Sequence, residues 1–260
     1  MPELPDVEIF TRYFNKTSLS QTITSVEVFR TRILRCSSFK ALRERLDGSR
    51  FVSAERYGKY LFARIGKDGY LVFHFGMTGS LCYFRGKEIP RSTRFMIDFV
   101  HDARLAFVDP RVFGKVDFTE SVQDYVKEKR LGPDAMNVGL ATFKSIIQAS
   151  GRPIKAELMD QKRIAGIGNI YSDEILFQSG VAPTDRSNKL DDGQLADIYR
   201  NMKKVLKAAI AKHADPDALP KKYYLLPHRG KEEECPRGCG HIKRIKVSGR
   251  TAYYCPACQK

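Results

Sequence analysis

Cys235-Pro236-Arg237-Gly238-Cys239 and Cys255-Pro256-Ala257-Cys258 contain four of the six cysteines of this 260-residue chain. Two cysteine pairs at this separation can place four thiolates at the corners of a tetrahedron around Zn²⁺. Residues 242–247 and 250–254, which lie between the pairs, are predicted to be two strands joined by a turn at Ser248-Gly249. The spacing therefore predicts a zinc-ribbon hairpin whose metal supplies the folding energy, because so small a module has almost no core. Four unrelated free thiols are the less favoured alternative.

The chain carries a large excess of positive charge. It has 45 Lys and Arg residues against 30 Asp and Glu residues, a formal net charge of +15. This balance indicates a polyanionic partner, most simply nucleic acid, although a basic enzyme with no such partner would have the same composition. The predicted hairpin contributes four of these charges, which suit contact with phosphates: Lys243, Arg244, Lys246 and Arg250.

Before the cysteine module, the spacing of hydrophobic residues changes from one typical of strands to one typical of helices near residues 119–130. Residues 3–17 are predicted to form a helix, because Val7, Phe10 and Phe14 share one face. Short strands with glycine-containing turns between residues 50 and 118 predict a β-sandwich or barrel. Helices are predicted at 121–129, 140–149, 153–159, 170–179 and 190–211. The fold class is therefore α+β with several domains.

The same sequence bears on the cellular compartment. No apolar run approaches the ~20 residues of a membrane span, and the acidic N-terminus is unlike a signal peptide. A cytoplasmic protein is expected. In a reducing compartment the cysteines argue against disulfides, and the isolated Cys36 and Cys82 are expected to be buried packing residues.

The N-terminal residues Met1-Pro2-Glu3 have two interpretations. Removal of Met1 would leave Pro2 with a secondary amine next to the Glu3 carboxylate, and a neutral amine is a nucleophile toward an aldehyde or sugar carbon. The resulting iminium acidifies the neighbouring C–H bonds. The alternative is structural, since Pro2 and Pro5 also suit the start of a helix. These residues alone favour the structural interpretation.

Three groups of loop residues are candidates for nucleic-acid contact. Gly166-Ile167-Gly168-Asn169, with Lys162 before it, can present backbone N–H groups to a phosphate at a helix N-terminus, but an ordinary turn has the same pattern. Lys59 follows Gly58 at a hairpin tip. Three further residues lie in sharp exposed turns, where they are either peripheral core or a wedge that enters a duplex and fills the space of an extruded base: Met77, Arg111 and Phe113.

Taken together, six stretches resemble the formamidopyrimidine-DNA glycosylase (Fpg/Nei) family and occur in the family order. They are Met1-Pro2-Glu3-Leu4-Pro5-Asp6-Val7-Glu8, Gly58-Lys59-Tyr60-Leu61, His74-Phe75-Gly76-Met77-Thr78-Gly79, Asp109-Pro110-Arg111-Val112-Phe113-Gly114, Asp160-Gln161-Lys162 with Ala165-Gly166-Ile167-Gly168-Asn169-Ile170-Tyr171, and Gly249-Arg250-Thr251 with Cys255-Pro256-Ala257-Cys258-Gln259-Lys260.

The resemblance implies an N-terminal helix plus β-sandwich (1–119), a helix-two-turn-helix domain (120–228) and a zinc finger (229–260). It implies a bifunctional DNA glycosylase and AP lyase of base excision repair, acting as a monomer on damaged double-stranded DNA. Pro2 would attack C1′ of the damaged nucleotide, Glu3 would act as general acid and base on the sugar, and Lys59 would support catalysis.

The resemblance also assigns the remaining site residues. Lys162, Asn169 and Arg250 would contact phosphates that flank the lesion, and Met77, Arg111 and Phe113 would fill the gap left by the flipped base. Cys235, Cys239, Cys255 and Cys258 would hold one structural Zn²⁺. The imine chemistry itself requires no metal.

The sequence departs from the family pattern at three places. Asp6 stands where the family usually has Glu, and the first cysteine pair is spaced by three residues instead of two. Residues 212–234 are shorter than the family's loop over the flipped base and lack its Gly-Gly-Thr-like segment. We therefore expect weak excision of 8-oxoguanine, with activity retained on formamidopyrimidines, hydantoins or abasic sites.

Two other functions remain open. One is an oxidised-pyrimidine glycosylase of the endonuclease VIII branch, which the Leu4-Pro5 start and the Arg111 and Phe113 tip disfavour. The other is a catalytically silent damaged-DNA-binding protein, against which Pro2, Glu3 and Lys59 argue together.

Overall fold

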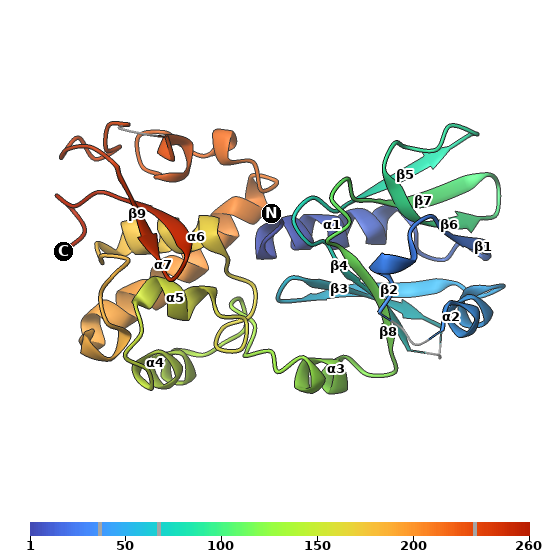
Figure 1. Cartoon of the computed structure of the whole chain (residues 1–260), viewed down its shortest axis with the longest axis horizontal. Helices are drawn as coiled ribbons and strands as arrows, with labels where there is room; N and C mark the ends of the chain where they lie inside the picture. The colour runs from blue at the N-terminus through green and yellow to red at the C-terminus, as the bar shows by residue number, and fades with distance from the viewer. Residues whose placement is uncertain (36–37, 67–68, 231–232) are drawn as a thin grey trace. The chain divides into compact units, whose positions relative to one another are not determined.

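The computed structural model describes residues 1–35, 38–66, 69–230 and 233–260. The chain divides into two compact units (Figure 1). The first contains Met1–Pro2 and Asp6–Lys129, and the second contains Glu3–Pro5 and Arg130–Lys260. The domain boundaries expected from the sequence stay a prediction.

The first unit contains two four-stranded antiparallel sheets. One sheet has the order β1-β6-β7-β5, from Ile23–Val28, Thr93–Phe99, Ala103–Val108 and Ser80–Arg85. The other has the order β2-β3-β4-β8, from Phe51–Tyr57, Tyr60–Ile65, Tyr70–His74 and Lys115–Thr119. Two helices complete the unit: α2 (Phe39–Leu46) and α3 (Val122–Glu128).

Helix α1 (Leu4–Thr17) supplies the centre of this unit's core. Val7 and Phe14 on one face are fully buried, and the ring of Phe14 lies 5.0 Å from that of Phe51 in β2. The same core contains residues of both sheets, so the apolar stripe of the helix is covered on both sides, as Figure 1 shows. Burying each large apolar side chain contributes about 1.5–3 kcal/mol. The predicted helix over 3–17 and the predicted sandwich are confirmed.

The second unit is built on helices α4 (Leu140–Gln148), α5 (Ile154–Met159), α6 (Asn169–Ser179) and α7 (Asp192–Ala211). Helix α7 begins with a capping box in which Asp191 and Gln194 exchange hydrogen bonds. Helix α6 is different, because its residues from Tyr171 to Phe177 are all buried. It is therefore the central helix of the unit, covered on every side.

The segment after α7 has little regular structure and leads into the cysteine module. It contains two short 3₁₀ turns, Pro216–Ala218 and Leu226–His228. Strands β9 (Lys243–Val247) and β10 (Arg250–Tyr254) then pair as an antiparallel hairpin. Ser248 and Gly249 both have positive φ, at 47° and 78°, which suits the tight turn of a hairpin. The predicted strand, turn and strand are confirmed.

Two smaller expectations have different outcomes. Cys82 lies in β5 and is partly exposed, so the expectation of a buried residue is wrong there, because β5 is an edge strand of its sheet. Cys36 lies outside the described residues. Within the part of the chain that the structure describes, no helix is long and apolar enough to cross a bilayer.

Candidate active site and nucleic-acid interface

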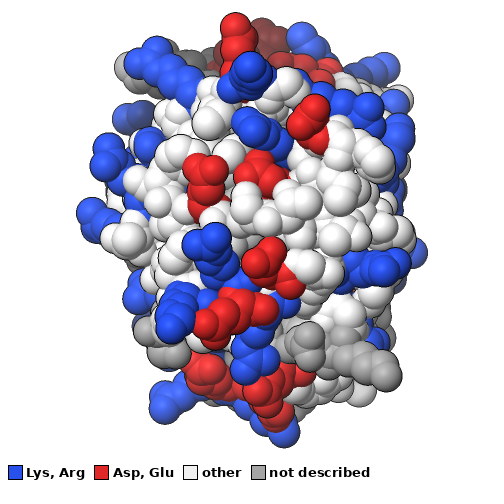
Figure 2. Space-filling model, turned by 90° about the vertical axis from the view of Figure 1, so that its right-hand side faces the viewer, with Lys and Arg blue, Asp and Glu red and all other residues white. Residues whose placement is uncertain are grey.

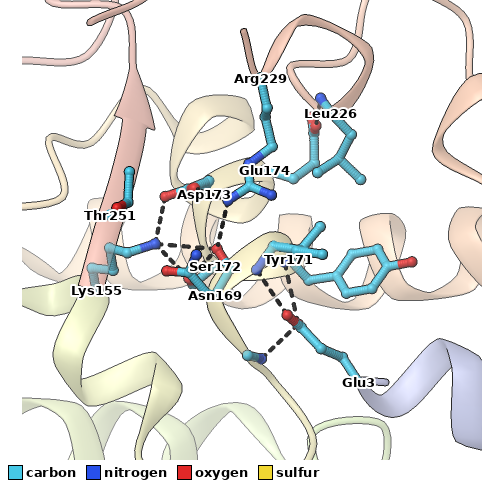
Figure 3. Close-up of polar contacts among 12 residues, drawn as sticks. Glu3, Lys155, Asn169, Tyr171, Ser172, Asp173, Glu174, Leu226, Arg229 and Thr251 are labelled. Atoms are coloured by element: carbon cyan, nitrogen blue, oxygen red, sulfur yellow. Dashed lines mark hydrogen bonds and ion pairs between the residues drawn. The ribbon is translucent and has the colours of Figure 1, made fainter. Parts of the chain in front are cut away.

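Glu3 is fully buried and binds the N-terminus of α6. Its Oε2 accepts hydrogen bonds from the N–H groups of Gly168 (2.7 Å) and Tyr171 (3.3 Å), and its Oε1 accepts one from Ile170 (2.7 Å) (Figure 3). The first N–H groups of a helix have no partner within the helix and carry partial positive charge, so a carboxylate is stabilised there. These bonds fix the orientation of the carboxylate directly after Pro2 in the chain.

The glycines of the Gly-Ile-Gly turn make room for residues 3 and 4. A Cβ atom on Gly168 would lie 2.3 Å from Cδ of Glu3, and one on Gly166 would lie 2.5 Å from Cδ1 of Leu4. Gly166 also has φ of +116° and accepts a hydrogen bond from the Leu4 N–H. The sequence suggested a phosphate as the partner of this turn's N–H groups. The Gly168 N–H of this turn donates instead to the chain's own Glu3, as do the N–H groups of Ile170 and Tyr171 in the first turn of α6.

We expect Gly168→Ala to reduce base excision by about 100-fold, the lower end of a general acid–base contribution, because the new methyl group displaces the Glu3 carboxylate. The backbone of Gly168 is extended (φ −129°, ψ −156°), so the substitution itself adds no left-handed strain. Single-turnover excision kinetics measure the effect. Gly139→Ala is the matched control, since nothing lies within 4 Å of its added Cβ; equal losses in both variants would contradict the explanation.

The structure places the three predicted phosphate ligands on the second unit. Asn169 is the first residue of α6, Arg250 is the exposed first residue of β10, and Lys162 is exposed in the loop that precedes the Gly-Ile-Gly turn. Helix α6 packs against β10. Asn169 and Arg250 are thus carried by elements in direct contact, while their roles toward phosphate stay predictions.

A buried ion network lies under Asn169, and sequence reasoning missed it. The Lys155 ammonium and the Asp173 carboxylate form an ion pair in which both side chains are fully buried. Lys155 also donates to the main-chain oxygen of Asn169 (3.2 Å) and to Oγ of Ser172 (3.0 Å), and Arg229 donates to the other oxygen of Asp173 (2.8 Å) (Figure 3). A lysine in a six-residue helix gives no sequence signal of burial; only its partners on α6, 14 to 18 residues later in the chain, explain it.

In the first unit, Asp109 joins the two loops that carry the predicted wedge. It is fully buried, and its carboxylate accepts hydrogen bonds from Oγ1 of Thr78 (2.5 Å) and from the N–H of Gly114 (2.7 Å). Met77 and Phe113 in these loops are 39% and 43% exposed, and the Arg111 guanidinium lies 5.0 Å from the centre of the Phe113 ring. The structure therefore brings Met77, Arg111 and Phe113 together on linked, exposed loops.

Lys59 lies at the turn between β2 and β3, where Gly58 has φ of 55°. Burial, together with the nearby charges of Lys59 and Lys115, lowers the pKa of His74 to about 4. His74 is consequently neutral at pH 7. Sequence analysis had quoted it within a motif without giving it a role.

A cavity of about 350 Å³ adjoins this histidine and the exposed wedge residue Phe113. Three of its lining residues are cations, which suits an anionic ligand such as phosphate; the lining is formed by Arg35, Tyr60, His74, Phe113, Lys115, Tyr125 and Lys129. Figure 2 views the first unit from the side at the right of Figure 1, and there basic and acidic residues are interspersed.

The four cysteines of the module converge on one point. Their Sγ atoms all lie within 4.8 Å of one another, with separations of 3.3 Å for Cys235–Cys239, 3.6 Å for Cys239–Cys255 and 3.9 Å for Cys235–Cys258. Zn–S bonds of about 2.3 Å in a tetrahedron put sulfur atoms about 3.8 Å apart. The cluster therefore fits one structural Zn²⁺.

The three-residue loop between Cys235 and Cys239 contacts helix α6 through Arg237. Arg237 lies in this knuckle and donates to the main-chain oxygens of Phe177 (3.0 Å) and Gln178 (3.4 Å), while its guanidinium lies 4.5 Å from the centre of the Phe177 ring. It thus binds the C-terminal carbonyls of α6, where a cation is favoured. The three-residue spacing is therefore compatible with the metal site. Arg237 within it holds the finger on α6.

Family models match nearly the whole chain. Residues 1–116 match the formamidopyrimidine-DNA glycosylase N-terminal domain, residues 131–217 match the H2TH domain of that enzyme, and residues 232–260 match a zinc finger found in FPG and IleRS.

Individual proteins agree with these models. Formamidopyrimidine-DNA glycosylase of Synechocystis sp. is 34% identical over 100% of this chain and 98% of its own length. A solved complex of the LlFpg protein with THF-DNA and an inhibitor has a TM-score of 0.90 at 30% identity and covers 100% of both chains. A complex of Lactococcus lactis FPG (MutM) with FAPY-dG containing DNA has a TM-score of 0.88 at 29% identity, covering 99% of this chain and 100% of that one.

A helix-centred β-sandwich, an H2TH domain and a four-cysteine finger define a class of DNA-repair enzyme, the bifunctional DNA glycosylase and AP lyase of base excision repair. The chain belongs to the formamidopyrimidine-DNA glycosylase family. The predicted family, fold class, enzyme class and single structural zinc are confirmed.

Proposed function

We propose that this protein removes oxidised or ring-opened purines from double-stranded DNA by attack of the Pro2 amine. The observation that carries the proposal is the Glu3 carboxylate, held by three N–H groups at the start of α6 directly after Pro2. The solved complexes support the substrate class, since L. lactis FPG is bound to FAPY-dG containing DNA and MutM to DNA containing carbocyclic 8-oxo-G.

The reaction follows from the two residues. The lone pair of the Pro2 nitrogen forms a bond to C1′, and the damaged base leaves with the electrons of the glycosidic bond. The departing base takes up a proton from water. The Glu3 carboxylate accepts the proton that the Pro2 nitrogen carries after the attack and delivers it to O4′, while the nitrogen lone pair forms the C=N bond of the iminium and the C1′–O4′ bond breaks. The iminium at C1′ then acidifies the C2′–H bond, so that loss of this proton expels the 3′ phosphate, and a further elimination expels the 5′ phosphate.

The remaining site residues take the roles that the resemblance implies, with Lys59 also supporting catalysis. Lys59, Lys162, Asn169 and Arg250 contact phosphates, and the linked loops of Asp109 insert their exposed side chains into the duplex. We place the protein in the cytoplasm, associated with the nucleoid through DNA, as a monomer.

Weak excision of 8-oxoguanine is part of the proposal, and residues 212–234 support it. Leu225 and Leu226 of this short segment are buried, and Leu225 packs with Phe177 of α6 and the finger cysteines. The Leu226 N–H donates to Glu174 (2.8 Å), and Gln178 donates to the main-chain oxygen of Tyr223 (2.7 Å). The described residues 212–230 of this segment are held on α6 at these points, which leaves little chain to close over a base.

Duplexes that each contain one lesion test this specificity. In single-turnover assays we expect formamidopyrimidine-guanine to be excised at least 10-fold faster than 8-oxoguanine opposite cytosine, a difference of about 1.4 kcal/mol in activation free energy. Equal excision rates for the two lesions would contradict the inference that residues 212–234 make 8-oxoguanine excision weak. Preference for oxidised pyrimidines would favour the endonuclease VIII-like alternative, and tight binding without excision or strand cleavage would favour the catalytically silent one.

The burial of Glu174 also predicts a pH dependence of stability. Burial raises the pKa of Glu174 from 4.5 to about 7, so the folded protein holds this proton more tightly than the unfolded chain does. The contribution of protonated Glu174 to the free energy of unfolding is fully present below pH 4.5 and is lost as the pH rises through 7. A difference of about 2.5 pKa units corresponds to about 3 kcal/mol.

We expect Glu174→Gln to remove this contribution. Between pH 5 and 8 the free energy of unfolding of the wild type should fall by about 2.5 kcal/mol relative to the variant. Urea denaturation of both proteins at a series of pH values measures the difference. Parallel pH profiles would contradict the assignment.

A further inference from the structure

Two buried polar atoms at the start of α6 complement each other. They are Oδ1 of Asn169, an acceptor, and Nε–H of Arg229, a donor, and neither has a hydrogen-bond partner among the described residues. The two residues are neighbours, since Nη2 of Arg229 lies 3.5 Å from the main-chain oxygen of Asn169. A buried polar group without a partner costs about 1–3 kcal/mol. A small rotation that joins these two atoms would remove both costs at once.

The position of the Arg229 guanidinium is fixed from two further sides. Its Nη2 donates to Oδ2 of Asp173, and its carbon lies 4.9 Å from the centre of the Tyr253 ring in β10. Asp173 is itself held by the buried ammonium of Lys155. Figure 3 shows that Arg229 and Lys155 approach Asp173 and the first turn of α6 from opposite sides. Lys155 and Asp173 are fully buried and bonded to groups of the protein, so neither side chain faces a ligand.

An asparagine that binds a phosphate must present its NH₂ group, because the amide oxygen would repel the anion. The two ends of the amide are nearly equal in shape, so the orientation depends on which group pairs with Oδ1. A donor behind the amide selects the orientation in which the NH₂ group points outward. The Nε–H of Arg229, whose guanidinium lies beside the main chain of Asn169, is an unpaired donor of this kind.

We propose that Arg229 is a positioning residue, whose Nε–H pairs with Oδ1 of Asn169 and turns the amide NH₂ toward a phosphate of the bound DNA. This inference rests on the proposed function, which gives Asn169 a phosphate contact. It adds that the contact depends on an arginine 60 residues later in the chain, in the segment before the zinc finger.

A double-mutant cycle tests the inference. The full-length, zinc-loaded protein is titrated with a duplex that contains one tetrahydrofuran abasic-site analogue, and Kd is measured for the wild type, Asn169→Ala, Arg229→Lys and the double variant. Hydrogen bonds to charged groups predict about a 10-fold loss for Asn169→Ala and a loss of several-fold for Arg229→Lys. The double variant should bind no more weakly than Asn169→Ala, because Arg229 acts only through that amide.

Arg237→Lys is the matched control. Arg237 also donates to main-chain oxygens of α6 and also lies over an aromatic ring, but at the C-terminal end of the helix. Any effect it has should add to that of Asn169→Ala. Thermal midpoints recorded for all variants separate loss of folding from loss of binding, and Arg229→Gln replaces the lysine variant in the cycle if the latter unfolds.

The outcomes distinguish failure of the positioning role of Arg229 from failure of the phosphate contact of Asn169. Losses that add for Asn169→Ala and Arg229→Lys would overturn the positioning role and leave the phosphate contact intact. An unchanged Kd for Asn169→Ala would overturn both. In either case the excision assay still reports on the proposed reaction, since that reaction depends on Pro2 and Glu3.

Discussion

Replacement of Glu3 by glutamine is expected to lower base excision by about 1,000-fold, within the 10²–10⁴ range of a positioned general acid. The amide cannot deliver the proton that opening of the sugar requires. It also turns an NH₂ group toward one of the helix N–H donors, at a cost of about 1–3 kcal/mol in stability. Single-turnover kinetics on a lesion duplex measure the first effect, and thermal unfolding measures the second.

The same variant should lose less on a preformed abasic site. An abasic sugar opens spontaneously to its aldehyde, so attack by Pro2 there does not wait for a proton on O4′. Binding to an abasic-site analogue should also change little. Glu27→Gln, an exposed substitution in β1, is the control and should behave like the wild type. Retention of excision by the Glu3 variant would contradict the assigned role.

Loss of zinc is expected to have the second large effect. Cys255→Ser removes one of four ligands, and binding of structural zinc to such peptides contributes about 10–16 kcal/mol of apparent free energy that is also folding free energy. The hairpin would unfold and take with it the exposed Arg250 and the Arg237 contacts with α6. We expect DNA affinity to fall at least 100-fold, about 2.8 kcal/mol. Fluorescence anisotropy with a labelled abasic-site duplex measures the loss.

Cys82→Ser is the matched control for the zinc experiment. Cys82 lies in β5 of the first unit, is not among the four clustered cysteines and is partly exposed. Its variant should keep one zinc per chain by elemental analysis and bind DNA normally. If Cys255→Ser kept both its zinc and its affinity, the four-cysteine site would not be what holds the finger on α6.

Local patterns in the sequence were sufficient for most of the fold. The apolar face of residues 3–17, the turn residues of the hairpins and the spacing of the cysteines each depend on neighbours within a few positions. Period and turn chemistry therefore predicted α1, the sandwich strands and the finger hairpin correctly. The resemblance, which rests on six motifs, placed the candidate residues along the chain.

The partners of the site residues could not be predicted in the same way. Glu3 binds N–H groups 165–168 residues later, and Gly168 is required because of that carboxylate, which no local pattern shows. Lys155 was predicted only as part of a helix, although it is fully buried. The three-residue spacing between Cys235 and Cys239 gave no indication that Arg237 within it binds the end of α6. Each of these facts depends on packing between distant segments.

The most direct test of the account is borohydride trapping on a duplex with one abasic site, followed by peptide mapping. Reduction converts an imine between protein and sugar into a stable bond. The account predicts a covalent adduct at the nitrogen of Pro2 in the N-terminal peptide of protein that lacks Met1. Absence of an adduct from processed, zinc-loaded protein that still binds the duplex would contradict the enzymatic mechanism.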